Sequence, residues 1–216
     1  MVGKDLKDKK DQRDLTVLKV PQGAWERVTG RMAAAVPADR EGRAIRWRFS
    51  VREADGINAR SRPDGRVDVT SATLPFVAND AELAAVLAHE MAHVYCRHGW
   101  QRAMESWAVL AGSAALGMIW SSREHDPGTA TALAGGLFLT VSSTALAARQ
   151  RGQELEADAV SLDLLRRAGY PPSAAPEFWT RYTSTRSDQK LGKGGWWLPH
   201  PPDRTRLRRL RELTAA

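Results

Sequence analysis

The stretch "LAAVLAHEMAHVYCRHGW", residues 83–100, decides how the rest of the chain is interpreted. It is apolar enough to form a buried helix, yet it carries His89, Glu90 and His93. Each residue of a helix advances by about 100°, so His89 and His93 share one face, where two imidazoles can bind one zinc ion. Glu90 then lies beside the open position of the metal, where a water molecule would bind. The alternative is two structural histidines and a solvated acid, and this short pattern alone does not decide between them.

A zinc site of this kind needs a third protein ligand. His98 is near in sequence, but it lies about 180° around the helix from His89, so we interpret it as a structural histidine. Glu154 is the better candidate, because it opens a predicted helix on which Asp158 follows one turn later on the same face. Asp158 can accept the remaining N–H of a ligand histidine. Alternatively, these acids form a solvated first turn near the positive end of the helix dipole.

The composition restricts the classes of partner and site. The chain has 216 residues and a formal net charge of +7, and much of the excess lies at 204–211. A basic terminal helix is usually a solvated face, and no nucleic-acid-binding motif accompanies it, so we expect no nucleic-acid partner. Cys96 is the only cysteine, which excludes an intrachain disulfide and a four-cysteine zinc site.

The domain organisation is expected to be simple. Residues 1–15 are predicted to form a flexible charged tail, and residues 16–216 a single domain. The N-terminal sequence "MVGKDLKDKKDQRD" lacks the apolar core of a signal peptide. Either the chain is not secreted, or a leader has been removed.

Alternating apolar residues predict a small sheet ahead of the histidine helix. Residues 22–35 have a helical pattern, whereas 44–55 and 66–74 alternate with period two, as half-buried strands do. The "RPDG" sequence at 62–65 predicts a turn before the second strand. We therefore predict an α+β fold that is mainly helical and contains a small antiparallel sheet.

The helix boundaries have their own signals. Asn79 or Asp80 is expected to cap the histidine helix at its start, and Gly99 to end it. Further along, we predict a helix over 152–169, a loop over 187–199 and a short basic helix over 203–213.

Two uncharged segments, 106–122 and 128–148, predict an apolar helical hairpin. The second segment is long enough to span a bilayer and the first is marginal. Both are rich in small residues, which allow close helix packing. Two interpretations remain open: a hairpin covered by protein, or membrane association through 106–148.

Several motifs, taken in order, resemble one family of zinc metallopeptidases: the HtpX, Oma-type and CAAX-prenyl-protease group, peptidase family M48 or minigluzincins. The motifs are "INARSRPDGRVDVTSATL", "AELAAVLAHEMAHVYCRHG", "ELEAD" followed by "AGYPPSAAPEFW", and "HPPDRTRL". The resemblance covers roughly residues 50–213. It implies a zincin-type fold, one zinc ion per chain and polypeptide substrates.

The resemblance also implies roles for single residues. The zinc ligands would be His89, His93 and Glu154, with Glu90 as general base and Asp158 supporting a ligand histidine. His200 and Arg206 would approach the metal from the far side, as substrate or transition-state contacts. For His200 two roles stay open: a donor to the transition-state oxyanion, or a fourth zinc ligand in the resting enzyme.

An edge strand can hold an extended peptide by backbone hydrogen bonds. Our candidate is the strand made of Arg66, Val67, Asp68, Val69 and Thr70, and Asn58 is also expected to contact substrate. An ordinary sheet strand would explain the same alternation. The chain departs from the family nearby. Where the family usually has aromatic and apolar residues and a Pro-Gly-Gly turn, it has Arg60, Ser61, Arg62 and then "PDG".

The predicted function is zinc-dependent hydrolysis of peptide bonds in extended or misfolded proteins. The resemblance suggests protein quality control in the cell envelope, in a periplasmic or membrane-associated protein. The alternative is a catalytically silent chaperone or scaffold of the same fold at the membrane. The complete set of two histidines, Glu90 and Glu154 argues against a silent site, because such a site has no need of the base.

Overall fold

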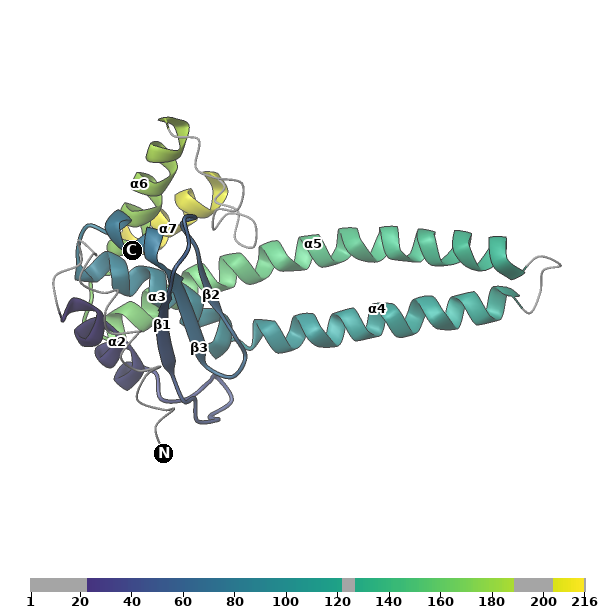
Figure 1. The fold of residues 1–216 in the computed structure, drawn as a ribbon, viewed down its shortest axis with the longest axis horizontal. Helices are drawn as coiled ribbons and strands as arrows, with labels where there is room; N and C mark the ends of the chain where they lie inside the picture. Colours follow the sequence, from purple (N-terminus) through teal and green to yellow (C-terminus); the bar gives the residue numbers. More distant parts are fainter. Residues whose placement is uncertain (1–22, 122–126, 189–203, 216) are drawn as a thin grey trace. The chain divides into compact units, whose positions relative to one another are not determined.

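The computed structural model describes residues 23–121, 127–188 and 204–215 (Figure 1). The expected tail at 1–15, almost all of the expected loop at 187–199, and His200 lie outside these residues. The chain divides into two compact units, Arg97–Leu155 and the remainder. The boundary after Leu155 falls inside one continuous helix.

A three-stranded sheet forms part of the first unit. Its strands are β1 (Arg48–Arg52), β2 (Ala59–Ser61) and β3 (Arg66–Thr70), in the spatial order β1-β3-β2. β1 and β3 run parallel, whereas β2 and β3 run antiparallel. The sheet is therefore mixed, and the prediction of an antiparallel sheet was wrong in this respect. The chain crosses from β1 to the far edge to form β2, and the turn at 62–65 returns it to the middle.

This strand order also corrects the expected edge strand. β3 is the central strand, and its residues Val67–Val69 pair with β1 on one side and with β2 on the other. Its backbone donors and acceptors there are used within the sheet, so residues 66–70 do not form an edge that could accept a peptide. The short strand β2 occupies that edge.

The sheet and helices enclose one apolar core. Val67 and Val69 point into it from β3, and Ala59 points into it from β2. The helix expected at 22–35 is confirmed as α2 (Ala24–Ala35), which buries Val28 and Met32 against the histidine helix. The α+β class is confirmed.

The histidine helix is α3 (Asp80–Tyr95), and almost all of its residues are buried. It begins as predicted, because the Asn79 side chain accepts a hydrogen bond from the Glu82 backbone N–H at 3.0 Å. The expected end at Gly99 was wrong. Cys96 caps the helix, Arg97 adopts the left-handed conformation (φ 61°), and the next helix begins at His98. The prediction assumed that a glycine ends the helix, but Arg97, a residue type that rarely adopts positive φ, makes the turn instead.

The second unit consists mainly of α4 (His98–Ser121) and of the part of α5 (Pro127–Arg167) that precedes Glu156. They run side by side (Figure 1), and two contacts join the first two turns of α4 to the part of α5 that precedes the unit boundary. Arg149 forms an ion pair with Glu105, and Gln153 donates to Gln101 at 3.0 Å. The segments predicted separately at 128–148 and 152–169 belong to one helix of 41 residues.

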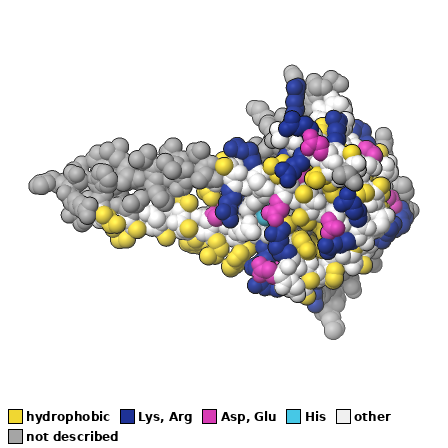
Figure 2. Space-filling view, turned by 180° about the vertical axis from the view of Figure 1, so that it is seen from behind, with side chains coloured by type: hydrophobic (Ala, Val, Ile, Leu, Met, Phe, Trp, Pro, Cys, Tyr) yellow, Lys and Arg dark blue, Asp and Glu magenta, His cyan; other side chains and the backbone are white. Residues whose placement is uncertain are grey.

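Large apolar side chains are exposed along α4. Each of these side chains is more than half exposed: Trp100, Met104, Trp107, Leu110, Met118 and Ile119. Figure 2 shows hydrophobic side chains along the described part of this helix. Within the described ranges, none of the helices has the length and apolar character needed to cross a membrane.

Three further elements complete the first unit: η2 (Ser71–Phe76), α6 (Ala174–Asp188) and α7 (Arg204–Ala215). Arg181 of α6 pairs with the buried carboxylate of Glu82 on α3 and donates to the Phe76 carbonyl at 2.9 Å. The predicted basic helix at 203–213 is confirmed as α7, which buries Arg206 and Leu210.

Candidate metal centre

Three predicted ligands lie together in the structure. His89, His93 and Glu154 are all buried, and one potential ligand atom from each lies within 4.8 Å of the others. The Nε2 atoms of His89 and His93 are 3.3 Å apart. Tetrahedral zinc with Zn–N bonds of about 2.0–2.1 Å places two ligand nitrogens about 3.3 Å apart. The two imidazoles therefore have the spacing that one zinc ion requires.

Helical continuity explains why Glu154 belongs to this group. Glu154 lies just before the boundary between the two units, and α5 continues through that boundary without interruption. Asp158 follows one helical turn later and contacts His89. Glu154 and Asp158 are four residues apart on this helix, so they lie on the same face of it.

Asp158 contacts His89, one of the predicted ligands. The Nδ1 atom of His89 lies 3.1 Å from Oδ1 of Asp158, and both side chains are 3% exposed. A proton on Nδ1 leaves the lone pair of Nε2 directed at the ligand group. The contact therefore selects the tautomer that a metal site needs.

Arg206 lies behind Asp158 and not among the three ligands. Its guanidinium donates two hydrogen bonds to the Asp158 carboxylate, at 2.7 and 2.8 Å, and lies over the Trp179 ring. Arg206 supplies the partner of opposite charge that a buried carboxylate needs, and its direct contact with substrate stays a prediction. Burial raises the pKa of Asp158, but hydrogen bonds from Arg206 and His89 outweigh burial and hold that pKa below its usual value.

Glu90 is completely buried beside the ligands, and β2 lies next to it. The Ser61 hydroxyl donates to Oε2 of Glu90 at 3.0 Å. Ser61 was not among the site residues predicted from the sequence. Its only signal was the departure from the family pattern at 60–62.

Asn58 and Thr70 are joined by a hydrogen bond. The Asn58 backbone N–H donates to the hydroxyls of Thr70 and Thr73, at 2.9 and 3.0 Å. The Thr70 hydroxyl in turn donates to the Gly56 carbonyl at 2.7 Å. These contacts fix the start of β2, so Thr70 supports the edge strand from behind.

A family comparison covers nearly the whole chain. The model of "Peptidase family M48" matches residues 20–214. The chain belongs to peptidase family M48. The resemblance found in the sequence is thereby confirmed at the level of the family.

Curated relatives agree with this M48 assignment. The "Beta-barrel assembly-enhancing protease" of Yersinia pestis is 33% identical over 165 residues, covering 73% of this chain and 30% of that protein. The "Mitochondrial metalloendopeptidase OMA1" of Schizosaccharomyces pombe is 30% identical over 171 residues, covering 78% and 47% respectively. The chain thus spans less than half the length of these relatives.

A second group of possible ligands in the M48 chain is less suited to a metal. Ligand atoms of Cys96, His98 and Glu156 also lie within 4.8 Å of one another. However, the Arg40 guanidinium donates to the Cys96 sulfur at 2.9 Å and to Glu156 at 2.5 Å, which places a cation in the group. Burial raises the pKa of the Cys96 thiol to about 11, and metals bind the thiolate. We therefore assign no metal to these residues.

Proposed function

We propose that this chain is a zinc-dependent metalloendopeptidase that hydrolyses extended or misfolded polypeptides. The observation that carries the proposal is the convergence of His89 and His93, with Nε2 atoms 3.3 Å apart, on the group that includes Glu154. Two imidazoles and one carboxylate leave a fourth position open, which is the ligand set of a catalytic zinc site.

Each residue of the candidate site has a separate role in the proposed hydrolysis. His89, His93 and Glu154 would hold the zinc ion, which would supply Lewis-acid chemistry for activating water and polarising the scissile carbonyl. Glu90 accepts the proton of the attacking water and passes it to the leaving amine. Asp158 keeps His89 in the ligating tautomer, and Arg206 keeps Asp158 ionised and oriented.

The edge strand β2 supports a way to present the substrate. Its outer edge is not paired with another strand of the three-stranded sheet, and its Ser61 touches Glu90. A peptide that adds to this edge in extended form would carry its backbone past the general base. β2 therefore replaces residues 66–70 as our proposed peptide-holding strand.

His200 lies outside the described residues, and both of its possible roles stay proposals. As a donor to the oxyanion it would stabilise the transition state, so His200→Ala should lower kcat much more than it raises KM. As a fourth zinc ligand in the resting enzyme it would occupy the position of the water, so the same change should raise activity. Steady-state kinetics separate the two, and unchanged rates would discard both.

The biological setting we propose is quality control of envelope or membrane proteins. The names of the Yersinia pestis and Schizosaccharomyces pombe relatives place one in β-barrel assembly and the other in mitochondria. The exposed apolar side chains of α4 are compatible with a membrane surface. Substrates of this setting would be polypeptides that have failed to assemble.

A matched pair of variants tests the chemistry. Glu90→Gln should bind about one zinc ion per chain, like the wild type, but should not cleave casein, because an amide cannot accept the proton of water. Glu177→Gln, which changes an exposed acid on α6, should retain both properties. Metal analysis and a casein assay give the two readouts. Undiminished cleavage by Glu90→Gln would exclude it as the base, and a wild type that binds zinc without cleaving would favour the silent scaffold.

A further inference from the structure

Exposed arginines mark the edge strand beside the active site. Arg60 and Arg62 alternate with Ser61, whose hydroxyl faces Glu90. Ser61 is paired with the buried Val67, whereas Arg60 is paired with Asp68 on the outer face of the sheet. The Arg62 backbone N–H still donates to the Arg66 carbonyl at 2.8 Å, so the ladder extends to Arg62. The two outward positions of this edge are therefore both cationic.

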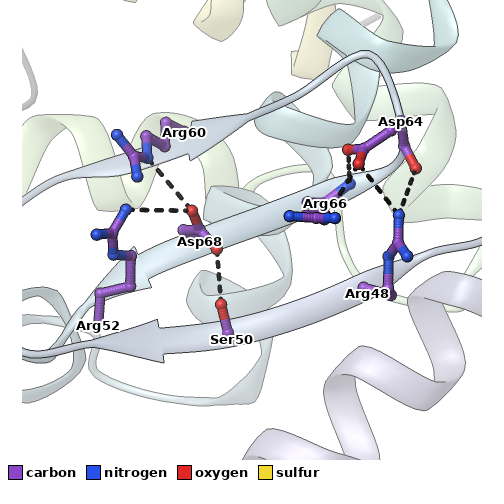
Figure 3. A network of polar contacts seen from close by, with 7 residues as sticks. All are labelled: Arg48, Ser50, Arg52, Arg60, Asp64, Arg66 and Asp68. Carbon is purple, nitrogen blue, oxygen red and sulfur yellow. Dashed lines mark hydrogen bonds and ion pairs between the residues drawn. The ribbon is translucent and has the colours of Figure 1, made fainter.

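Acidic groups on this face are shared among several arginines (Figure 3). Asp68 lies 3.3 Å from Arg60 and 3.7 Å from Arg52 and also accepts a hydrogen bond from Ser50. Because each guanidinium has five N–H donors, one shared carboxylate leaves several donors of Arg60 for another acceptor.

The Arg62 side chain has fewer polar partners than the Arg60 side chain. Asp64, the nearest acid along the chain, pairs with Arg48 and Arg66, at 3.1 Å in each case. Within the described part of the chain, the Arg62 side chain has no hydrogen-bond or ion-pair partner. A charged side chain at an edge can face a residue of an added strand directly.

We propose that β2 selects extended substrate segments that carry acidic side chains two residues apart, in the pattern acid–any–acid. This rests on the proposed peptidase function and on addition of substrate to β2. Strand side chains alternate with period two, so residues two apart in the substrate lie on the outer face, opposite Arg60 and Arg62. The intervening residue points towards Glu90 and the ligands. Glu53 lines a pocket together with Arg52 and Arg60. Because its carboxylate would repel a further acidic side chain, we expect the preference for acids only at the substrate positions opposite Arg60 and Arg62.

The expected size of the effect follows from cross-strand charge pairs. One such pair changes an equilibrium by about 1.4-fold to fivefold, so two pairs together give a preference of roughly twofold to twenty-five-fold. These arginines are exposed, so added salt should weaken the preference.

Binding to the Glu90→Gln protein tests the proposal without requiring hydrolysis. Fluorescent peptides of equal length and composition compare an alternating Glu-Thr repeat with a Glu-Glu-Thr-Thr repeat, and a Gln-Thr repeat serves as the uncharged reference. In the Glu-Glu-Thr-Thr peptide no two acids are two residues apart, although its net charge is the same. We expect the alternating acidic peptide to bind most tightly, with the other acidic peptide severalfold weaker.

Variants of the arginines complete the test. Arg60→Gln combined with Arg62→Gln should remove the preference, while Arg48→Gln, on the same face but on the opposite edge strand, should keep it. Equal binding of the two acidic peptides, or a preference that survives the double change, would overturn the proposal. If the preference is present but casein is never cleaved, the selection stands and the proposed hydrolysis fails.

Discussion

Arg206 and Asp158 form a buried ion pair that contacts His89 of the candidate metal site. Both side chains are 5% exposed or less, and two hydrogen bonds join them. A buried pair of this kind adds little net stability over an apolar pair, but removal of one partner leaves an uncompensated charge. The pair therefore matters because it holds the carboxylate ionised and oriented against His89.

Arg206→Met should expose this dependence. We expect a loss of about 3–5 kcal/mol in the free energy of unfolding. Zinc affinity should fall about 10- to 100-fold, because Asp158 no longer fixes the ligand histidine. Arg206→Lys keeps the charge but not the two-pronged contact, so its effects should be intermediate. Urea unfolding and competition with a zinc chelator measure the two quantities.

The control for this variant is Arg208→Met on the same helix. Arg208 is 74% exposed and forms only a surface ion pair with Glu212, so both quantities should stay near those of the wild type. Equal effects of the two substitutions would show that Arg206 has no special role.

At the scale of single residues, the sequence predicted the group of His89, His93 and Glu154 and the position of Asp158, but not the contacts of Ser61 with Glu90 and of Arg206 with Asp158. His89, Glu90 and His93 lie within five consecutive residues of one helix, so their relative positions can be predicted from their spacing in the sequence. The supporting contacts join residues far apart: Ser61 and Glu90 are separated by 29 positions, and Asp158 and Arg206 by 48. Such pairs depend on how elements pack, and a single sequence does not encode that in any local pattern.

At the scale of helices and strands, the periodicity of the sequence predicted which segments are strands better than it predicted how the strands are arranged in the sheet. Alternation identified the segments that became β1 and β3 and showed which of their residues face the core. It could not show that β3 lies in the middle, because a pattern of period two defines faces and not neighbours. A similar limit applied to α5, where the sequence predicted a separate helix from residue 152 inside a segment that is helical throughout.

Two glycines test these elements in opposite directions. Gly152 lies in the continuous helix α5, and an added Cβ would meet no atom within 4 Å, so Gly152→Ala should raise stability by about 0.5–1 kcal/mol. Gly65 has φ +84°, and an added Cβ would lie 2.7 Å from the Arg46 carbonyl oxygen, so Gly65→Ala should destabilise the sheet by more than that. Thermal unfolding measures both. A destabilising Gly152→Ala would indicate that the helix is interrupted there, as the sequence first suggested.

At the scale of the whole molecule, the exposed side chains of α4 need an explanation. Soluble proteins often expose single apolar residues, but here several large ones occur on one helix. Trp100, Met104 and Trp107 recur at helical spacing of four and three residues, which places them on one face. Such a face, with tryptophan among its residues, is typical of helices that lie at a membrane surface.

We therefore expect the protein to bind lipid vesicles through α4. Trp107→Gln combined with Leu110→Gln should lower the fraction of protein that floats with anionic vesicles at least tenfold, because burial of a large apolar side chain contributes about 1.5–3 kcal/mol. Arg208→Gln on α7 removes a positive charge without changing α4, and it should float like the wild type if apolar contact dominates. A wild type that stays monomeric and does not float would exclude the membrane surface as the partner of this helix. Flotation that is lost in Arg208→Gln but kept in the α4 variant would instead assign the attraction to the basic C-terminal helix.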